Sequence, residues 1–279
     1  MYRILIAGAG YVGSRIASHF CSKNQKVFGI IQTPERKSEL EKIGVVPLIT
    51  DLTQFETIPT IPPVNFVVIA CAPDERDETS YRKVYIEGTQ NLLRKLKEGA
   101  PPFLVVYLSS TGVYQDFGGE WIDETVLPVP ETVRGKILLE AEKQVLNSGL
   151  PSVIFRLSGI YGPERNRIAS AREGKPKMDE TDEYINMIHV DDIVNAIPVL
   201  FKSAEPGEVY LGVDDEPVLR SEFFGWFAKK VNIPVPKISA SGKIGGKRCH
   251  NGHLKSLGFS PCYPTFRDGY SILLNQNKV

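Results

Sequence analysis

The stretch RILIAGAGYVGSRIASHF (residues 3–20) decides the fold of this chain. A short apolar run leads directly into Gly8-Ala9-Gly10-Tyr11-Val12-Gly13, and apolar residues at helical spacing follow. In such a motif the first glycine allows a tight turn, the second lets a pyrophosphate approach the backbone, and the third permits close helix–strand packing. The following helix offers free N–H groups to phosphates. The strand–loop–helix context therefore predicts a dinucleotide-binding loop, with a purely structural turn as the alternative.

Further apolar runs alternate with amphipathic segments along the chain. The predicted strands are 3–8, 26–31, 45–49, 65–72, 103–110 and 152–157, and the predicted helices are 11–22, 79–97 and 135–147. Strands that are continuously apolar and rich in Val and Ile are typical of a parallel sheet buried on both faces. The order predicts an α/β protein with a Rossmann-type, doubly wound parallel sheet. A buried stripe is expected on the second helix, made of Val84, Ile86, Leu92, Leu93 and Leu96.

The alternation loosens after residue 162. Residues 163–184 are mostly charged and predict a surface loop or lid. Five basic residues of this loop could meet an anionic substrate, although a solvated loop is the simpler interpretation: Arg165, Arg167, Arg172, Lys175 and Lys177. A helix from about Asp191, a strand over 207–213 and a helix over 221–231 are predicted next. We expect a Rossmann domain over 1–162 and a smaller C-terminal substrate part over 163–279, with segments near 186–200 and 207–213 returning to the first domain.

Composition narrows the class of protein. The 279 residues include 33 Lys and Arg against 33 Asp and Glu, so no basic field indicates nucleic acid or an anionic membrane. No apolar run approaches the roughly 20 residues of a membrane span, and the apolar N-terminal run is too short for a signal peptide. Four scattered cysteines suit free thiols in a reducing compartment. The prediction is a soluble cytoplasmic protein that binds small molecules, with no nucleic acid or membrane partner.

The choice between NAD and NADP depends on the end of the second predicted strand. An acidic residue there would hold the ribose 2′-hydroxyl, but this strand ends in Gln32 and Thr33. Arg36 and Lys37 lie just beyond and could reach a 2′-phosphate, which favours NADP over NAD. Asp51 could meet the adenine edge, although a turn aspartate is an equal alternative. Three small residues at the end of the fourth strand would form a wall beside the cofactor: Ala70, Cys71 and Ala72.

Five segments, in order along nearly the whole chain, carry a family resemblance. They are YRKVYIEGTQNLL (81–93), LSSTGVYQD (108–116), FRLSGIYGPER (155–165), INMIHVDDIVNAI (185–197) and GKRCHNGHLKSLGFSPCYPTFRDGY (246–270). The first four resemble the motifs of extended short-chain dehydrogenases/reductases of the NAD-dependent epimerase/dehydratase type. The last is similar to the tail of their small, atypical bacterial YeeZ-like branch. The resemblance implies a Rossmann domain with a smaller C-terminal substrate part.

The resemblance also implies hydride transfer at C4 of a nicotinamide, with a Ser or Thr hydroxyl, a Tyr and a Lys as the machinery. The hydroxyl position falls on Ser110, with Thr111 as runner-up, and the lysine position falls on Lys136, which would bind the nicotinamide ribose. The tyrosine position falls on Thr132 in VPETVRGKILLEAEK (129–143). A threonine hydroxyl is a poor general acid, because its pKa lies far above any working pH. The YeeZ-like branch carries Ser or Thr at this point, so the change is a property of the branch.

Two further departures separate the chain from sugar-nucleotide epimerases. Its glycine motif is GxGxxG where extended members carry GxxGxxG, and its substrate part is short. The first hypothesis is an atypical NAD(P)-dependent oxidoreductase or epimerase acting on an unidentified small molecule, with Thr132 assisting and water or a substrate hydroxyl relaying the proton. The alternative is a non-catalytic NADP-binding redox sensor or regulator. The family's common dimer, through helices near 80–97 and 135–148, implies a possible homodimer.

Several other side chains could take part in chemistry. Tyr114, Tyr161 and Tyr184 could bring a phenol to the nicotinamide, with packed aromatics as the alternative. His189, Asp191 and Asp192 could act in acid/base chemistry, but we expect Asp191 to cap the helix that begins there and His189 to be a structural residue. Pro198 should kink or end that helix. One set has the residue types of a zinc site but not a usual zinc spacing, so no metal is predicted: Cys249, His250, His253 and Cys262.

Overall fold

The computed structural model describes residues 1–168, 181–234 and 243–276. By its contacts the chain forms two compact units. Unit 1 consists of Met1–Tyr114, Pro128–Arg156 and Ile193–Tyr210, and unit 2 of Gln115–Leu127, Leu157–Asp192 and Leu211–Val279. Assignment of cofactor and substrate roles to 1–162 and 163–279 stays a prediction.

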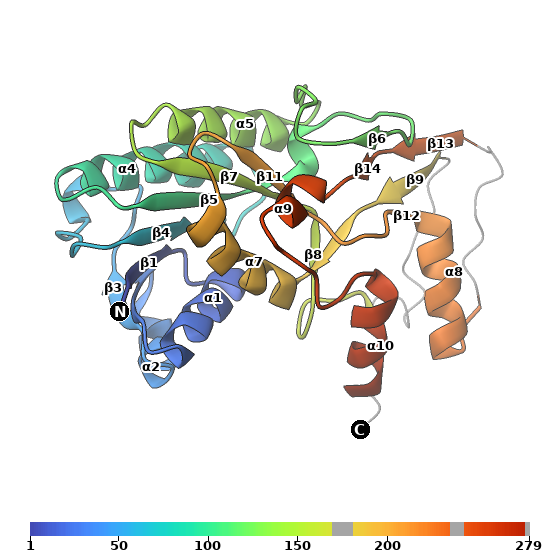
Figure 1. The fold of residues 1–279 in the computed structure, drawn as a ribbon, viewed down its shortest axis with the longest axis horizontal. Helices are drawn as coiled ribbons and strands as arrows, with labels where there is room; N and C mark the ends of the chain where they lie inside the picture. The colour runs from blue at the N-terminus through green and yellow to red at the C-terminus, as the bar shows by residue number, and fades with distance from the viewer. Residues whose placement is uncertain (169–180, 235–242, 277–279) are drawn as a thin grey trace. The chain divides into compact units, whose positions relative to one another are not determined.

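The central sheet has seven strands in the order β11-β7-β5-β4-β1-β2-β3 (Figure 1). The strands are β1 (Arg3–Ala7), β2 (Lys26–Ile31), β3 (Val46–Ile49), β4 (Phe66–Ile69), β5 (Leu104–Ser110), β7 (Ser152–Leu157) and β11 (Val209–Gly212). The pairs from β3 across to β5 are parallel. The order turns back between β1 and β4, which is the switch point at which doubly wound sheets bind ligands at the carboxyl ends of their strands. The predicted fold class is confirmed.

Helices cover both faces of this sheet. They are α1 (Tyr11–Ser22), α2 (Lys37–Lys42), α4 (Thr89–Lys97), α5 (Val133–Leu146) and α7 (Val190–Ser203), with short 3₁₀ turns at Pro34–Arg36, Phe55–Thr57 and Thr111–Val113. In Figure 1, α4 and α5 lie on one face, whereas α1 and α7 lie on the other. Phe201 of α7 stacks on Phe20 of α1 and on Phe66 of β4, with ring centroids 5.5 and 4.2 Å apart. These apolar contacts fix the helices to the sheet.

The predicted helix over 79–97 differs from the structure in its middle. It consists of α3 (Glu78–Tyr81), a π-helical segment (Arg82–Gly88) and α4. A π turn holds more residues than an α turn and so shifts which side chains face inward. Leu92, Leu93 and Leu96 are buried as predicted, but Val84 and Ile86 are only partly buried, and Tyr85 is buried between them.

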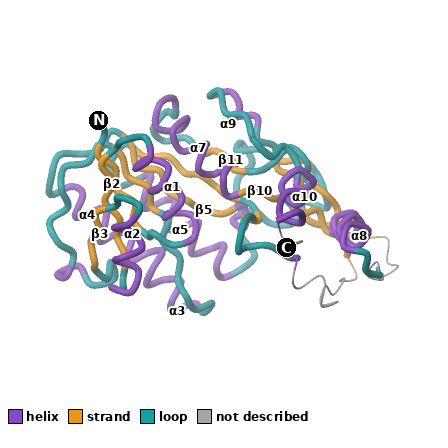
Figure 2. Tube along the Cα trace, turned by 90° about the horizontal axis from the view of Figure 1, so that it is seen from below, coloured by secondary structure: helices purple, strands orange, loops and turns teal. Residues whose placement is uncertain are grey.

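Unit 2 contains the remaining elements. Its strands are β6 (Trp121–Ile122), β8 (Gly159–Tyr161), β9 (Thr181–Ile185), β10 (Met187–His189), β12 (Val218–Leu219), β13 (Lys243–Gly246) and β14 (Arg248–Cys249), and its helices are α8 (Arg220–Val231), α9 (Gly252–Ser256) and α10 (Phe266–Gln276). Figure 2 shows α8 and α10, which pack against β9 and β10 respectively. Their apolar sides form a core with Phe223, Phe227, Phe266 and Tyr270.

Two sequence predictions need correction here. Residues 181–184, predicted as loop, belong to β9, because β12 and β13 pair with its two edges. Helix α7 continues through Pro198 to Ser203, so the proline does not end it. Among the described residues, none of the helices combines the length and apolar character needed to cross a bilayer.

Candidate functional site

The glycine loop lies between β1 and α1. Each of its three positions is a glycine for a different structural reason. Gly8 has a φ of +90°, and a Cβ there would lie 2.7 Å from the Cys71 nitrogen. A Cβ on Gly13 would overlap the Gly8 carbonyl oxygen. Both glycines are therefore required by the packing of the loop itself. Gly10 is different, because a Cβ there would meet nothing within 4 Å. The space above Gly10 is open, at the exposed N-terminus of a 12-residue helix.

Tyr11 and Val12 complete the loop as the first two residues of α1, both partly buried. The Arg15 guanidinium lies over the Tyr11 ring at 4.0 Å and donates to the Tyr11 carbonyl at 2.9 Å. This contact fixes the first turn of α1, whose free N–H groups attract phosphates.

The end of β2 brings together the residues predicted to distinguish NAD from NADP. Arg36 donates through Nη1 to the Ala9 carbonyl at 2.6 Å and pairs with Glu39 at 3.2 Å. Its guanidinium therefore lies against the glycine loop. Gln32 is exposed and donates to Asp51 Oδ2 at 3.3 Å. Thr33 is exposed in the turn that follows β2.

The ends of β4 and β5 carry the predicted wall and hydroxyl residues. Ala70 donates its N–H to the Ala7 carbonyl at 2.8 Å, and Cys71 lies against Gly8. Burial raises the pKa of Cys71 to about 12, so this thiol stays protonated, and Ala72 is exposed. At the end of β5, Ser110 Oγ accepts from the Gly112 N–H at 3.1 Å, whereas Thr111 is buried.

Helix α5 begins beside this turn. Thr132 is its N-cap, and the Thr132 hydroxyl accepts from the Gly135 N–H at 3.0 Å. A Cβ on Gly135 would lie 2.6 Å from the Gly112 oxygen, so only glycine lets α5 approach the Ser110 turn this closely. Lys136 follows on the first turn and is exposed. The hydroxyl of Thr132 is thus engaged in capping, which is what threonine at this position does best.

These contacts bring the predicted residues of unit 1 into one row. The glycine loop, the Ala70–Cys71 wall and the Ser110 turn follow three adjacent strands, β1, β4 and β5, at their carboxyl ends. Gly8 contacts Cys71, and the Ser110–Gly112 turn contacts the start of α5. On the other side of β1 in the sheet, Gln32 and Arg36 follow β2, and Asp51 follows β3. This is the arrangement that a dinucleotide lying across the switch point would need.

A buried charged network, which the sequence did not predict, joins β5, α5 and β7. Arg156 donates to both oxygens of Glu142, at 2.7 Å to Oε2 and 3.0 Å to Oε1, and donates to the Tyr114 hydroxyl at 2.6 Å. The Ser109 hydroxyl donates to Glu142 Oε1 at 2.5 Å. Tyr114 is only 4% exposed. Its phenol is therefore held inside unit 1 by Arg156. Nothing in the spacing of these residues predicts the network.

The other two candidate phenols belong to unit 2. Tyr161 is buried, and its ring stacks on Tyr270 at a centroid distance of 4.8 Å. Burial, with the nearby Asp214, raises the pKa of the Tyr161 hydroxyl far above its usual range. Tyr184 lies in β9, where its ring is 4.9 Å from the Arg248 guanidinium. Both rings are packed aromatics within unit 2.

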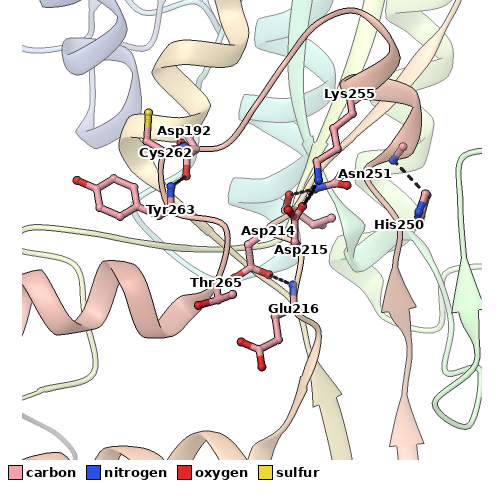
Figure 3. Close-up of polar contacts among 12 residues, drawn as sticks. Asp192, Asp214, Asp215, Glu216, His250, Asn251, Lys255, Cys262, Tyr263 and Thr265 are labelled. Carbon is pink, nitrogen blue, oxygen red and sulfur yellow. Dashed lines mark hydrogen bonds and ion pairs between the residues drawn. The ribbon is translucent and has the colours of Figure 1, made fainter.

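The Asp192 side chain of the IHVDD segment binds the C-terminal tail within unit 2 (Figure 3). The Asp192 carboxylate accepts from the Cys262 and Tyr263 N–H groups at 2.6 and 3.1 Å. The predicted cap, Asp191, is wrong: α7 begins at Val190, and His189 Nδ1 accepts from the Asp191 N–H at 3.2 Å. The imidazole thus performs the capping, because it precedes the helix and Asp191 lies within its first turn.

The tail also contains the two cysteines and two histidines for which the sequence predicted no metal site. Burial raises the pKa of Cys249 to about 12, which disfavours the thiolate that would bind zinc, and His250 Nδ1 accepts from the Gly252 N–H at 3.1 Å. His253 lies in α9, and Cys262 is exposed. Within the described part of the chain, no three such side chains are arranged around a common metal position.

Two described basic residues of the predicted loop, Arg165 and Arg167, also lie in unit 2. Gly162 and Arg165 exchange backbone hydrogen bonds at 2.9 and 3.2 Å. Arg172, Lys175 and Lys177 lie outside the described residues. The anion-binding role of this segment stays a prediction.

Asp214, just after β11, is a buried carboxyl with one oxygen that has no partner among the described residues. Its Oδ1 accepts from the Glu216 N–H at 3.3 Å, whereas Oδ2 has no hydrogen bond. Figure 3 shows the neighbouring Asp215. Its Oδ1 forms an ion pair with Lys255 Nζ at 2.6 Å and accepts a hydrogen bond from Asn251 Nδ2 at 2.6 Å. Burial raises the pKa of Asp214 well above its usual range. The folded chain therefore binds this proton more tightly than the unfolded chain does.

Asp214→Asn is expected to flatten the pH dependence of stability. With the folded pKa raised, the free energy of unfolding falls as pH rises from the unfolded pKa, about 3.9, towards the folded value. An amide lacks this fall, so the variant should gain thermal stability relative to the wild type as pH increases. Unfolding midpoints measured at several pH values test this, with the exposed Asp74→Asn as control. A constant difference between Asp214→Asn and wild type across the series would contradict it.

Comparisons with known proteins agree with this geometry. Residues 4–211 match the family model described as the NAD dependent epimerase/dehydratase family. The chain is 25% identical over 280 residues to Protein YeeZ of Escherichia coli strain K12, covering 95% of this chain and 97% of that protein. A solved structure from Methylobacillus flagellatus, assigned to the NAD-dependent epimerases/dehydratases, has 32% identity and a TM-score of 0.84, with 100% and 99% of the two chains covered.

A more distant structure shares the fold alone. DesIV, a dTDP-glucose 4,6-dehydratase of Streptomyces venezuelae solved with NAD and TYD bound, is 17% identical, with a TM-score of 0.83 over 98% of this chain and 96% of that one. The family resemblance seen in the sequence motifs, including the YeeZ-like branch, is confirmed by these matches.

Proposed function

We propose, from the premise that this chain belongs to the NAD dependent epimerase/dehydratase family, that it is an NAD(P)-dependent oxidoreductase or epimerase for a small molecule. The dinucleotide would lie along the carboxyl ends of β2, β1, β4 and β5 in unit 1. The nicotinamide supplies or accepts a hydride at its C4 when it is bound. The substrate, the cytoplasmic location and the homodimer remain predictions.

The open space at Gly10 is the observation that carries the proposal. Gly8 and Gly13 are explained by contacts of the protein with itself, whereas Gly10 has no such contact within 4 Å. A glycine that the fold does not require, at a helix N-terminus, fits a backbone that a pyrophosphate approaches. The residues present therefore suit the group that the family name implies.

NADP is the preferred form of the cofactor in this proposal. Arg36 is held at the glycine loop by the Ala9 carbonyl, and the end of β2 presents Gln32 where an NAD-specific chain would carry a carboxylate. A guanidinium suits a 2′-phosphate because it offers paired donors and a permanent charge. Asp51, which accepts from Gln32, would then lie near the adenosine end.

Substrate orientation is assigned to the turn after β5. Ser110 is partly exposed there, and its hydroxyl would orient the substrate oxygen, with Thr111 as the less exposed alternative. Lys136 would hold the nicotinamide ribose. Thr132 contributes by capping α5 and so fixing Lys136, since its hydroxyl is already bound to the Gly135 N–H. A substrate-side proton donor must then come from another group.

The engaged Thr132 hydroxyl also favours a second candidate function, a non-catalytic NADP-binding sensor. The two candidates differ in turnover, not in binding. Fluorescence titration with NADPH and NADH measures cofactor binding and preference, and a panel of ketones, aldehydes and sugars with NADPH measures turnover. Saturable binding without any turnover would favour the sensor. Absence of binding to both nucleotides would overturn both candidates.

Lys136→Ala is expected to weaken NADPH binding about tenfold, the loss of one charged hydrogen bond. Lys136 is exposed on the first turn of α5, so the thermal unfolding midpoint should stay unchanged. Lys143→Ala, on the last turn of the same helix, is the matched control and should bind normally. Equal NADPH affinity in wild type and Lys136→Ala would remove this lysine from the site.

A further inference from the structure

The π-helical segment between α3 and α4 turns a tyrosine into the interior of unit 1. Tyr85, near the middle of Arg82–Gly88, is 6% exposed, and its ring stacks on Tyr81 at a centroid distance of 6.0 Å. The segment packs against α5, and Arg82 bridges to Glu140 of α5 at 3.2 Å. In Figure 1 the helices α4 and α5 lie side by side on this face. Such π turns are frequent at functional sites.

Residues of four elements lie near the Tyr85 phenol. Arg134, on the first turn of α5, lies close enough to the Tyr85 hydroxyl to lower its pKa. Cys71, at the end of β4, and Tyr107 of β5 are close enough to interact with it electrostatically, as is Tyr81 of α3. Cys71 also lies against Gly8, and Arg134 is two residues before Lys136. The hydroxyl is therefore flanked by the end of β4 and by the helix start that carries Thr132 and Lys136.

We propose that Tyr85 is the proton donor that replaces the phenol absent at Thr132. This inference rests on the proposed function. In the reductive direction a bound NADPH would supply the hydride to a substrate carbonyl carbon. The carbonyl oxygen takes the proton of the Tyr85 hydroxyl, which leaves an alcohol and a phenolate. Arg134 stabilises that phenolate through its charge, and solvent returns the proton after product leaves.

The charges around the phenol fit a donor. Burial raises the pKa of Tyr85, whereas Arg134 lowers it. The hydroxyl is thus protonated at neutral pH and ready to donate. Oxidation of an alcohol would need the phenolate instead, so turnover in that direction should rise at alkaline pH. If an oxidised nicotinamide bound near the Tyr85 phenol, its positive charge would lower the pKa of that phenol further, whereas the reduced ring is neutral.

The difference between the two cofactor forms gives a test on the purified protein without a substrate. Phenolate absorbance in the near ultraviolet is measured at one alkaline pH at which the protein remains folded, without nucleotide, with saturating NADP⁺ and with saturating NADPH. NADP⁺ is expected to increase the ionised fraction of one tyrosine about tenfold, as a cation within roughly 6 Å would do, and NADPH is not. Tyr85→Phe should abolish the increase.

Matched variants separate the possible outcomes. Tyr81→Phe should keep the NADP⁺-dependent increase, and Arg134→Gln should reduce the phenolate signal while Arg134→Lys retains it. Fluorescence titration confirms separately that NADPH binds to each variant. If both nucleotides bind and the signal is the same in wild type and Tyr85→Phe, the role of Tyr85 is overturned and the proposed function stands. If neither nucleotide binds the wild type, the proposed function fails, and the role of Tyr85 with it.

Discussion

Gly10→Asp is expected to weaken NADPH binding about a thousandfold without lowering the thermal unfolding midpoint. The Gly10 side-chain position is open, so the added carboxylate fits the apoprotein. Aspartate is a favoured N-cap, and its charge suits the positive end of α1. The same charge would lie about 4 Å from a pyrophosphate, where two like charges repel by about 4 kcal/mol near a protein surface. Binding is lost, and folding is not.

Gly10→Asn separates the charge from the bulk at this position. Asparagine has the shape of aspartate and caps equally well, but it is neutral. Its NADPH affinity should fall between those of wild type and Gly10→Asp. Fluorescence titration gives the affinities, and thermal unfolding of the apoproteins gives the stabilities. Wild-type NADPH affinity in Gly10→Asp would remove the observation that carries the proposed function.

Gly13→Ala is the opposite case in the same loop. Its new Cβ would overlap the Gly8 carbonyl oxygen, which is backbone and cannot move aside. Overpacking of this kind lowers stability by about 3 kcal/mol. The apoprotein of this variant should therefore unfold at a lower temperature than either Gly10 variant. Two glycines of one motif thus separate a requirement of the fold from a requirement of the ligand.

The sheet was the most predictable part of the molecule. Its strands are continuous apolar runs, and the glycine loop fixes which run comes first, so local pattern and global fold agree. The row of loop residues at the carboxyl ends of β1, β4 and β5 follows from this topology alone. Unit 2 was less predictable, because β9 is a half-buried strand that depends on β12 and β13, far along the chain, for its pairing.

Side-chain roles within the site were harder to predict than its position. Hydrophobic periodicity assumes an α-helix, so it could not show that a π turn replaces Val84 and Ile86 by Tyr85 on the inner face. A family motif marked Thr132 as a missing phenol, but only geometry shows its hydroxyl capping α5. The same limit applies to His189, whose capping role depends on where α7 begins. The role of each of these side chains is set by the backbone conformation of a single helical turn, and a pattern of residue types does not specify that conformation.

The buried pair Glu142–Arg156 predicts the second large effect. Glu142→Leu is expected to lower the free energy of unfolding by about 3–5 kcal/mol, because it leaves the Arg156 charge buried without its partner. Arg156 is 4% exposed and Glu142 is 2% exposed, so solvent cannot replace the lost contact. Urea unfolding measures the change. The surface pair Arg82–Glu140 is a matched control, and Glu140→Leu should change stability by about 1 kcal/mol at most.

Replacing both charges distinguishes a network from a simple pair. Glu142→Leu combined with Arg156→Met removes the buried charge, and such replacements are often neutral or stabilising when nothing else depends on the pair. Here the Tyr114 and Ser109 hydroxyls would each lose a partner, at about 1–3 kcal/mol apiece. The double variant should therefore recover only part of the loss, and adding Tyr114→Phe and Ser109→Ala should recover more. Full recovery in the double variant would show that the two hydroxyls contribute nothing, and Tyr114 would then not depend on Arg156 for its place in unit 1.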